Sequence, residues 1–275
     1  MDIELHGSGP VRVVVVPGGP GLPNEAYREL IDGLSRAHTV VTYRQWGSHP
    51  RPLTDYPHTV EEYADELSDV VRTVPSGAEG GQPIVLLGHS FGAAVVLEAL
   101  LRGVPAAGAV IMSGYTSGEM IKAGIGARVA DLPDAFHRRR SGLEAEDGSG
   151  IAELLFEYWI PVHFCRVVPM PESLQYGFAN LNPHLQRHFL GGDLMNLQGE
   201  MLKWDREAAV GSLRLPVLFT AGEFDYLTHD QLYGLQRSIP DSELWIGPTT
   251  SHCGWFEDPD AYFNRITTFI AERCT

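Results

Sequence analysis

The sequence has little of three features that each mark a particular class of protein. It has only three cysteines in 275 residues, Cys165, Cys253 and Cys274. Their odd number and their spacing favour reduced thiols over a disulfide framework or a zinc site. No apolar run approaches the roughly 20 residues that a membrane span needs. Residues 1–5 have neither a basic start nor an apolar stretch, so we expect no secretory signal and a cytoplasmic protein.

Basic side chains are also scarce. The 20 Lys and Arg residues are outnumbered by 35 Asp and Glu residues, which gives a net charge of −15. This charge argues against nucleic acid or an anionic membrane as a partner. The one basic cluster, residues 138–140, is close to Glu144, Glu146 and Asp147, and we interpret it as a solvated loop face. The sequence leaves the oligomeric state open.

What the sequence does contain is an alternation of buried strands and helices. Hydrophobic residues make up 44% of the chain, enough for one α/β domain with an inserted subdomain. Apolar runs predict strands at 11–16, 39–43, 84–87, 107–112, 215–221 and 243–246. Helical patterns lie at 25–35, 59–74, 92–102, 230–238 and 259–273. This order predicts a mainly parallel sheet with helices on both faces.

The alternation stops over residues 117–202, which carry Pro, Gly and many aromatic residues but no strand–helix rhythm. We therefore predict a mostly helical cap subdomain at 117–202, inserted into a core domain formed by 1–116 and 203–275.

The segment Gly-His-Ser-Phe-Gly at 88–92 places Ser90 between a predicted strand and a helix that opens with small residues. In a strand–turn–helix of this kind, the serine is held in a strained turn, and the flanking glycines let strand and helix approach closely. The N–H groups at the helix start favour developing negative charge. We interpret Ser90 as a nucleophile; the alternative is a tight turn with an incidental serine.

A serine nucleophile needs a base, and the base needs an orienting carboxylate. Asp225 follows the strand at 215–221, with Glu223 as a competitor two residues earlier. His252 follows the strand at 243–246 and precedes the last helix. Since the carboxyl ends of parallel strands share one rim, we predict the catalytic triad Ser90, Asp225 and His252. Cys253, beside the base, is interpreted as a bystander.

The oxyanion hole should come from two backbone segments. One donor is the N–H of Phe91, directly after the nucleophile. The other comes from the glycine-rich loop at 17–21, where we select Gly19 for the hole and Gly18 for substrate contact. This chemistry requires no cofactor and no metal.

With these residues placed, the chain resembles the proline iminopeptidase branch of the α/β-hydrolases. The matching segments are 17–21, 43–47, 88–92, 195–205, 222–225 and 251–259. The resemblance implies an α/β-hydrolase fold with an inserted cap and an aminopeptidase-like serine hydrolase activity. It also implies that an acidic side chain after the catalytic Asp helps to bind a free α-amino group.

The chain departs from that family pattern at three positions. Pro17 stands where the family has His, Arg44 where it has Asp, and Tyr226 where it has the amine-binding Glu. Glu200 is the candidate for a second amine-binding acid from the cap. With one anion fewer, the case for a free N-terminal amine is weaker.

Aromatic residues are candidates for a substrate pocket, although each could equally belong to the core of the cap. Besides Gly18 and Glu200, our substrate-binding candidates are Trp46, Trp159, Tyr226 and Trp255. The other aromatic residues of the predicted cap are Phe156, Tyr158, Phe164, Tyr176 and Phe178.

The predicted function is hydrolysis of an amide or ester bond of a small molecule or short peptide through an acyl-enzyme. One alternative is a biosynthetic tailoring enzyme, such as an amidase, acyltransferase or cyclase, that uses the same triad. An alternative of another class is a hydrolase-fold ligand receptor without turnover.

Overall fold

The central element of the computed structural model is a mainly parallel sheet. The structure describes residues 2–51, 56–74, 81–143 and 148–275, and within them seven strands form one sheet in the order β1-β3-β2-β4-β5-β6-β7. The strands are β1 (Ile3–His6), β2 (Arg12–Val16), β3 (Thr39–Tyr43), β4 (Ile84–His89), β5 (Gly108–Met112), β6 (Val217–Gly222) and β7 (Ser242–Gly247). All neighbouring pairs are parallel except β1 with β3.

All six predicted strands are present, and the predicted α/β fold with a mainly parallel sheet is confirmed. Every residue of β2, β3 and β5 is buried, as expected for strands covered on both faces. The sequence reading missed β1. This strand lies at the edge, has only four residues, and two of them are exposed, so no apolar run marks it.

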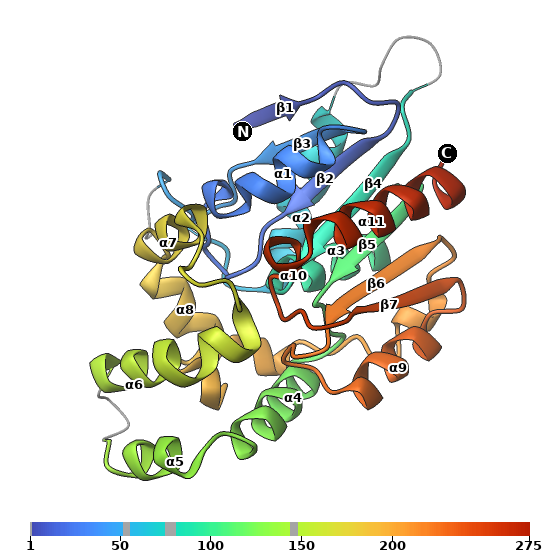
Figure 1. Cartoon of the computed structure of the whole chain (residues 1–275). Coiled ribbons are helices and arrows are strands. Elements are labelled where there is room, and N and C mark those ends of the chain that lie inside the picture. The colour runs from blue at the N-terminus through green and yellow to red at the C-terminus, as the bar shows by residue number, and fades with distance from the viewer. Residues whose placement is uncertain (1, 52–55, 75–80, 144–147) are drawn as a thin grey trace.

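Helices cover both faces of the sheet (Figure 1). Helices α1 (Arg28–Leu34) and α11 (Pro259–Arg273) pack together on one face, and α2 (Val60–Thr73) and α3 (Phe91–Leu101) pack together on the other. The remaining core helices are η1 (Asn24–Tyr27), η5 (Val210–Ser212), α9 (His229–Ser238) and α10 (Gly254–Glu257). The helix predicted at 25–35 is divided at Tyr27 into a 3₁₀ turn and α1. No helix in the described ranges has the length and apolar character to cross a membrane.

The insertion that follows β5 and ends with η4 contains helices and, among its described residues, no strand. They are α4 (Gly118–Ala130), α5 (Asp134–Ser141), α6 (Gly148–Leu154), η2 (Leu155–Phe164), α7 (Glu172–Ala179), α8 (Pro183–Leu190), η3 (Leu194–Asn196) and η4 (Glu200–Lys203). Figure 1 shows them gathered beyond one end of the sheet. The insertion is thus mostly helical, as expected, while the exact division at residues 117 and 202 stays a prediction.

The basic cluster at 138–140 is not a loop face. It forms the last turn of α5, where positive charge is favoured by the helix dipole. Arg139 pairs with Glu157 of η2, and Arg140 pairs with Asp193 before η3. Two of its three side chains therefore link α5 to other parts of the insertion. The acidic residues that we expected beside it, Glu144, Glu146 and Asp147, lie outside the described residues.

Helix α2 contributes a buried carboxyl group to the fold. Thr59 and Glu62 form the capping box that starts this helix. One turn further on, the Glu66 carboxylate accepts the Trp46 N–H, at 3.1 Å and 3.2 Å to its two oxygens. Burial raises the pKa of Glu66 to about 7, although the Trp46 N–H and nearby Arg51 oppose the rise.

We predict that Glu66→Gln removes a pH-dependent loss of stability. Because the folded-state pKa of about 7 lies above the unfolded value of about 4.3, the folded protein binds the proton more tightly. The stability contribution of Glu66 is therefore complete below the unfolded pKa and falls as pH rises towards 7. Urea denaturation across this interval should show a smaller decline for the variant than for the native chain. Equal declines would contradict the assignment.

Candidate active site

Ser90 is held in a strained backbone conformation at the carboxyl end of β4. Its φ of 55° and ψ of −119° fall in a region that non-glycine residues rarely adopt. The turn is fixed on both sides, since the Ser90 N–H donates to the Met112 carbonyl at 2.9 Å and its carbonyl accepts the Ala93 N–H at 2.9 Å. The backbone therefore presents the side chain at the start of α3.

The two glycines of the motif permit this turn by close backbone packing. A Cβ on Gly88 would lie 2.3 Å from the Gly92 carbonyl oxygen. A Cβ on Gly92 would lie 2.1 Å from the Val16 carbonyl oxygen. No flexible side chain could move aside in either case, because the obstructing atoms belong to the backbone. The predicted strand–turn–helix arrangement is present.

An aspartate and a histidine are paired beside this turn. The His252 Nδ1 and Asp225 Oδ1 atoms are 2.8 Å apart, and both side chains are buried. Burial raises the pKa of Asp225, but the charge and hydrogen bond of His252 and the N–H of Tyr226 outweigh burial and lower it overall. The competitor Glu223 instead accepts the Thr249 N–H at an exposed position. Asp225, and not Glu223, orients the imidazole.

Contacts from the insertion hold the loops that carry Asp225 and His252. Arg128 of α4 donates to the carbonyl of Asp225 at 2.9 Å and to those of Glu223 and Leu227, each at 3.2 Å. These contacts of Arg128 were not predicted, because nothing in the sequence distinguishes one arginine on a helix from another.

The end of η2 holds the histidine loop in the same way. The His163 carbonyl accepts the His252 N–H at 3.2 Å, and the Phe164 carbonyl accepts the Cys253 N–H at 2.8 Å. Both Asp225 and His252 are therefore positioned partly by the insertion.

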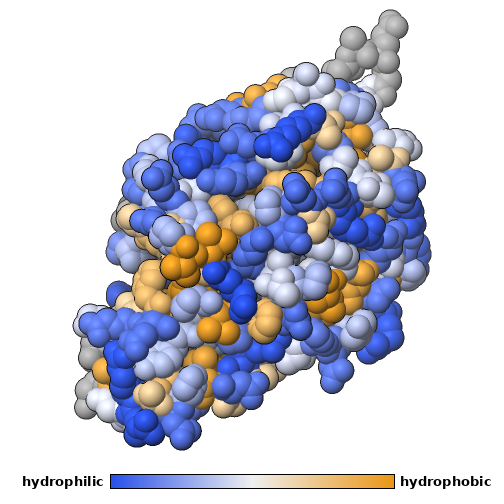
Figure 2. Space-filling model, in the orientation of Figure 1, coloured by the Kyte–Doolittle hydropathy of each residue, from blue (hydrophilic) through white to orange (hydrophobic). Residues whose placement is uncertain are grey.

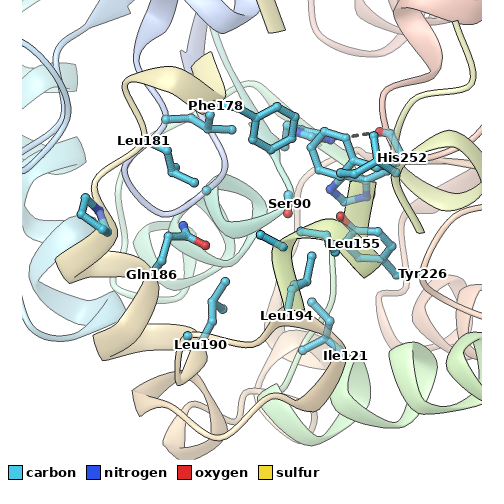
Figure 3. A pocket seen from close by; sticks show the side chains of 18 of the residues that line it. Ser90, Ile121, Leu155, Phe178, Leu181, Gln186, Leu190, Leu194, Tyr226 and His252 are labelled. Atoms are coloured by element: carbon cyan, nitrogen blue, oxygen red, sulfur yellow. Dashed lines mark hydrogen bonds between the residues drawn. The ribbon is translucent and has the colours of Figure 1, made fainter. Parts of the chain in front are cut away.

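Ser90 and His252 line a cavity of about 450 Å³ between the sheet and the insertion. Figure 3 shows Ser90 among apolar side chains that come from several helices of the insertion. The larger apolar lining residues are Leu22, Ile121, Leu155, Phe156, Ile160, Phe164, Phe178, Leu181, Leu190 and Leu194. Gln186 and Arg187 add polar groups, and the described lining includes no Asp or Glu.

The mouth of this cavity is partly exposed. Phe156 lines the cavity and is also 49% exposed, with its ring 5.6 Å from that of Phe178. Figure 2 shows mostly polar residues on one face of the molecule, with hydrophobic residues gathered in more than one place. Within the described ranges, no three His, Cys, Asp or Glu side chains cluster in a way that could hold a metal ion.

The strained serine and the histidine–aspartate pair lie beside one cavity at the carboxyl edge of a parallel sheet. A comparison with models of known protein families agrees with this arrangement. The model of the family described as "Alpha/beta hydrolase family" matches residues 13–265. The chain belongs to the alpha/beta hydrolase family. Among curated relatives of this hydrolase, the proline iminopeptidase of Saccharolobus solfataricus is 26% identical over 272 residues, 94% of this chain and 84% of that protein. That of Thermoplasma volcanium is 23% identical, over 94% of this chain and 88% of that protein.

Solved structures give the same fold for this hydrolase. The proline iminopeptidase of Mycobacterium smegmatis superposes with a TM-score of 0.82 at 23% identity, covering 98% of this chain and 94% of that one. The protein VinJ superposes with a TM-score of 0.87 at 20% identity and the same coverage. The resemblance to the proline iminopeptidase branch is thus confirmed.

The structure brings part of the predicted site of this hydrolase together. Gly19 and Tyr226 line the cavity beside Ser90 and His252. Tyr226 lies flat on the His252 ring, with centroids 4.0 Å apart and planes 12° apart. The Phe91 side chain is buried away from the cavity, but its N–H opens α3 and has no partner inside the helix.

Five predicted substrate contacts do not line the cavity. The Gly18 N–H instead donates to the Tyr27 hydroxyl, and Trp255 stacks beneath Tyr27. Trp159 is fully buried and packs against Tyr226 from behind. The other two lie near the surface. Trp46 is stacked under Arg51, and Glu200 pairs with Lys203.

The sequence reading also missed His89 and Tyr27, which both line the cavity. His89 lies inside the nucleophile motif, so its position was a signal that we did not use. Tyr27 lies within the helix predicted at 25–35, and only the fold brings its hydroxyl to the site.

The close packing at the turn predicts opposite effects for two Gly→Ala changes. Gly92→Ala should lower the free energy of unfolding by more than about 1 kcal/mol, because backbone atoms must move apart. Gly126→Ala is the matched control, since this exposed glycine of α4 has open space around it. It should raise stability by about 0.5 to 1 kcal/mol. Chemical denaturation that finds the two variants equally stable would contradict the packing argument.

Proposed function

We propose that Ser90, His252 and Asp225 are a catalytic triad that hydrolyses an amide or ester of a small molecule or short peptide through an acyl-enzyme. The observation that carries the proposal is that the strained Ser90 opens into the same cavity as His252, which is bonded to Asp225 at 2.8 Å. Nucleophile, base and orienting acid are the three parts that this chemistry needs.

The hydrogen bond to Asp225 assigns the roles of the two imidazole nitrogens. Because an ionised carboxylate only accepts, the His252 Nδ1 carries the proton and Nε2 presents its lone pair. Nε2 removes the proton from Ser90 as its hydroxyl oxygen attacks the substrate carbonyl, and it later donates that proton to the leaving group. The N–H groups of Gly19 and Phe91 stabilise the oxyanion. Water then repeats the attack on the acyl-enzyme and releases the acid.

Ser90→Ala should abolish both turnover and labelling by a fluorophosphonate probe, because the attacking oxygen is gone. Cys253→Ala is the control: this buried thiol should not be needed for labelling, and burial raises its pKa well above the usual value. Gel fluorescence of the probe distinguishes the variants. Labelling that survives in Ser90→Ala, or that disappears in Cys253→Ala, would overturn the assignment of the nucleophile.

The lining of the cavity supports an uncharged, apolar acyl group as the part of the substrate next to Ser90. The walls are mostly Leu, Ile and Phe, and Arg187 is the one described lining residue with a permanent charge. An ammonium group here would lose water without gaining an anionic partner. Tyr226, at the position where the resemblance predicts an amine-binding acid, instead covers the His252 ring.

A second candidate is cleavage of an amino acid with a free N-terminus, which the names of the relatives favour. The set of nucleophile, base, acid and glycine loop favours turnover over a ligand receptor. Since water suffices to complete the cycle, hydrolysis is proposed ahead of acyl transfer or cyclisation.

A matched pair of esters separates the two candidates. The para-nitrophenyl esters of isocaproic acid and of leucine share one carbon skeleton and differ by the α-ammonium group. Relative to its uncatalysed hydrolysis, the isocaproyl ester should have a kcat/KM at least about 100-fold higher, because the charged group has no partner in the cavity. Equal values, or a preference for the leucyl ester, would favour the free-amine peptidase.

A further inference from the structure

A chain of hydrogen bonds runs beneath the catalytic residues and joins three separate segments. The Gly18 N–H and the Tyr27 hydroxyl are 2.7 Å apart, and that hydroxyl is 2.8 Å from His89 Nδ1. His89 Nε2 is 3.0 Å from the His252 carbonyl oxygen. We propose that Tyr27 and His89 are positioning residues that set the glycine loop and the histidine loop relative to Ser90.

The direction of every bond in this chain is fixed by its two ends. The His252 carbonyl can only accept, so His89 Nε2 must carry the ring proton, and Nδ1 is then an acceptor. The Tyr27 hydroxyl therefore donates to Nδ1, and its oxygen accepts the Gly18 N–H. The chain has one arrangement of protons in which every group is satisfied.

Burial makes this arrangement hard to replace with water. Tyr27 and His89 are 2% and 1% exposed, and the Trp255 ring stacks on Tyr27 and meets His89 edge-on. Burial raises the pKa of the Tyr27 hydroxyl, so it keeps its proton and remains a donor. Burial, together with the neighbouring His252, holds the pKa of His89 well below its usual value, so it stays neutral.

The hydrogen-bond chain joins the three segments whose relative positions matter in the proposed mechanism. Gly18 precedes the proposed oxyanion donor Gly19, His89 precedes Ser90, and the His252 carbonyl belongs to the base itself. Ser113 adds a second donor to that carbonyl, with its hydroxyl 3.1 Å away. The inference rests on the proposed triad, since the chain has a catalytic role only if Ser90 and His252 react.

A displacement of one loop by about 1 Å can cost about 100-fold in rate. Tyr27→Phe removes the link to both neighbours and keeps the ring that packs on Trp255. We expect it to lower kcat by about tenfold to a hundredfold while KM changes little. His89→Phe should have a similar effect, and His89→Gln should recover part of it by restoring a donor to the His252 carbonyl.

Two further variants distinguish a positioning role from a general loss of stability. Tyr63→Phe is the matched control, since Tyr63 is another buried tyrosine whose hydroxyl donates to a carbonyl, that of Trp46, outside the cavity. It should lose similar thermal stability without the loss in kcat. The double variant of Tyr27→Phe with His89→Phe should lose no more than the worse single variant, because both break one chain.

The tautomer of His89 gives a readout that does not depend on activity. Nitrogen-15 NMR of the histidine-labelled protein should show His89 neutral and protonated at Nε2 at neutral pH. A proton on Nδ1 would overturn the proposal, and so would an unchanged kcat in folded Tyr27→Phe or losses that multiply in the double variant. If Ser90→Ala kept full activity, the triad itself would fail, which is a separate outcome.

Discussion

The close backbone contact among β2, β4 and α3 is the constraint on which the site depends. It requires glycine at 88 and 92, and it holds Ser90 at a φ of 55°. A non-glycine residue occupies this region only where its surroundings over-determine it. Here the conformation of Ser90 is fixed by the buried strands on both sides and by its backbone hydrogen bonds to Met112 and Ala93.

The insertion is as important to the site as the sheet. It supplies most of the cavity wall, and it also fixes the two loops that carry Asp225 and His252. Arg128 binds the acid loop through three carbonyls, and the end of η2 accepts the N–H groups of His252 and Cys253. A change in the insertion would therefore alter both substrate fit and the geometry of the triad residues. The shape of the pocket and the placement of the reacting groups are coupled through these contacts.

The sequence predicted the parts of this molecule that follow from local patterns. Continuous apolar runs marked the buried strands, and the order of Ser90, Asp225 and His252 after three of them predicted one rim. Contacts between distant segments could not be read in this way. Trp159 and Trp255 were predicted at the substrate, but the fold places them behind Tyr226 and Tyr27. Arg128 and Tyr27 became visible only when α4 and η1 were placed against the loops that they bind.

Ser90 is the proposed nucleophile, and the N–H groups of Gly19 and Phe91 are proposed to hold the oxyanion that its attack creates. A crystal structure of the enzyme after reaction with an alkyl fluorophosphonate tests this proposal most directly. We predict phosphorus bonded to Ser90 Oγ, the phosphoryl oxygen about 2.7–3.1 Å from both N–H groups, and the alkyl chain in the apolar cavity. Phosphorus on another side chain, or a phosphoryl oxygen turned away from both N–H groups, would contradict the account.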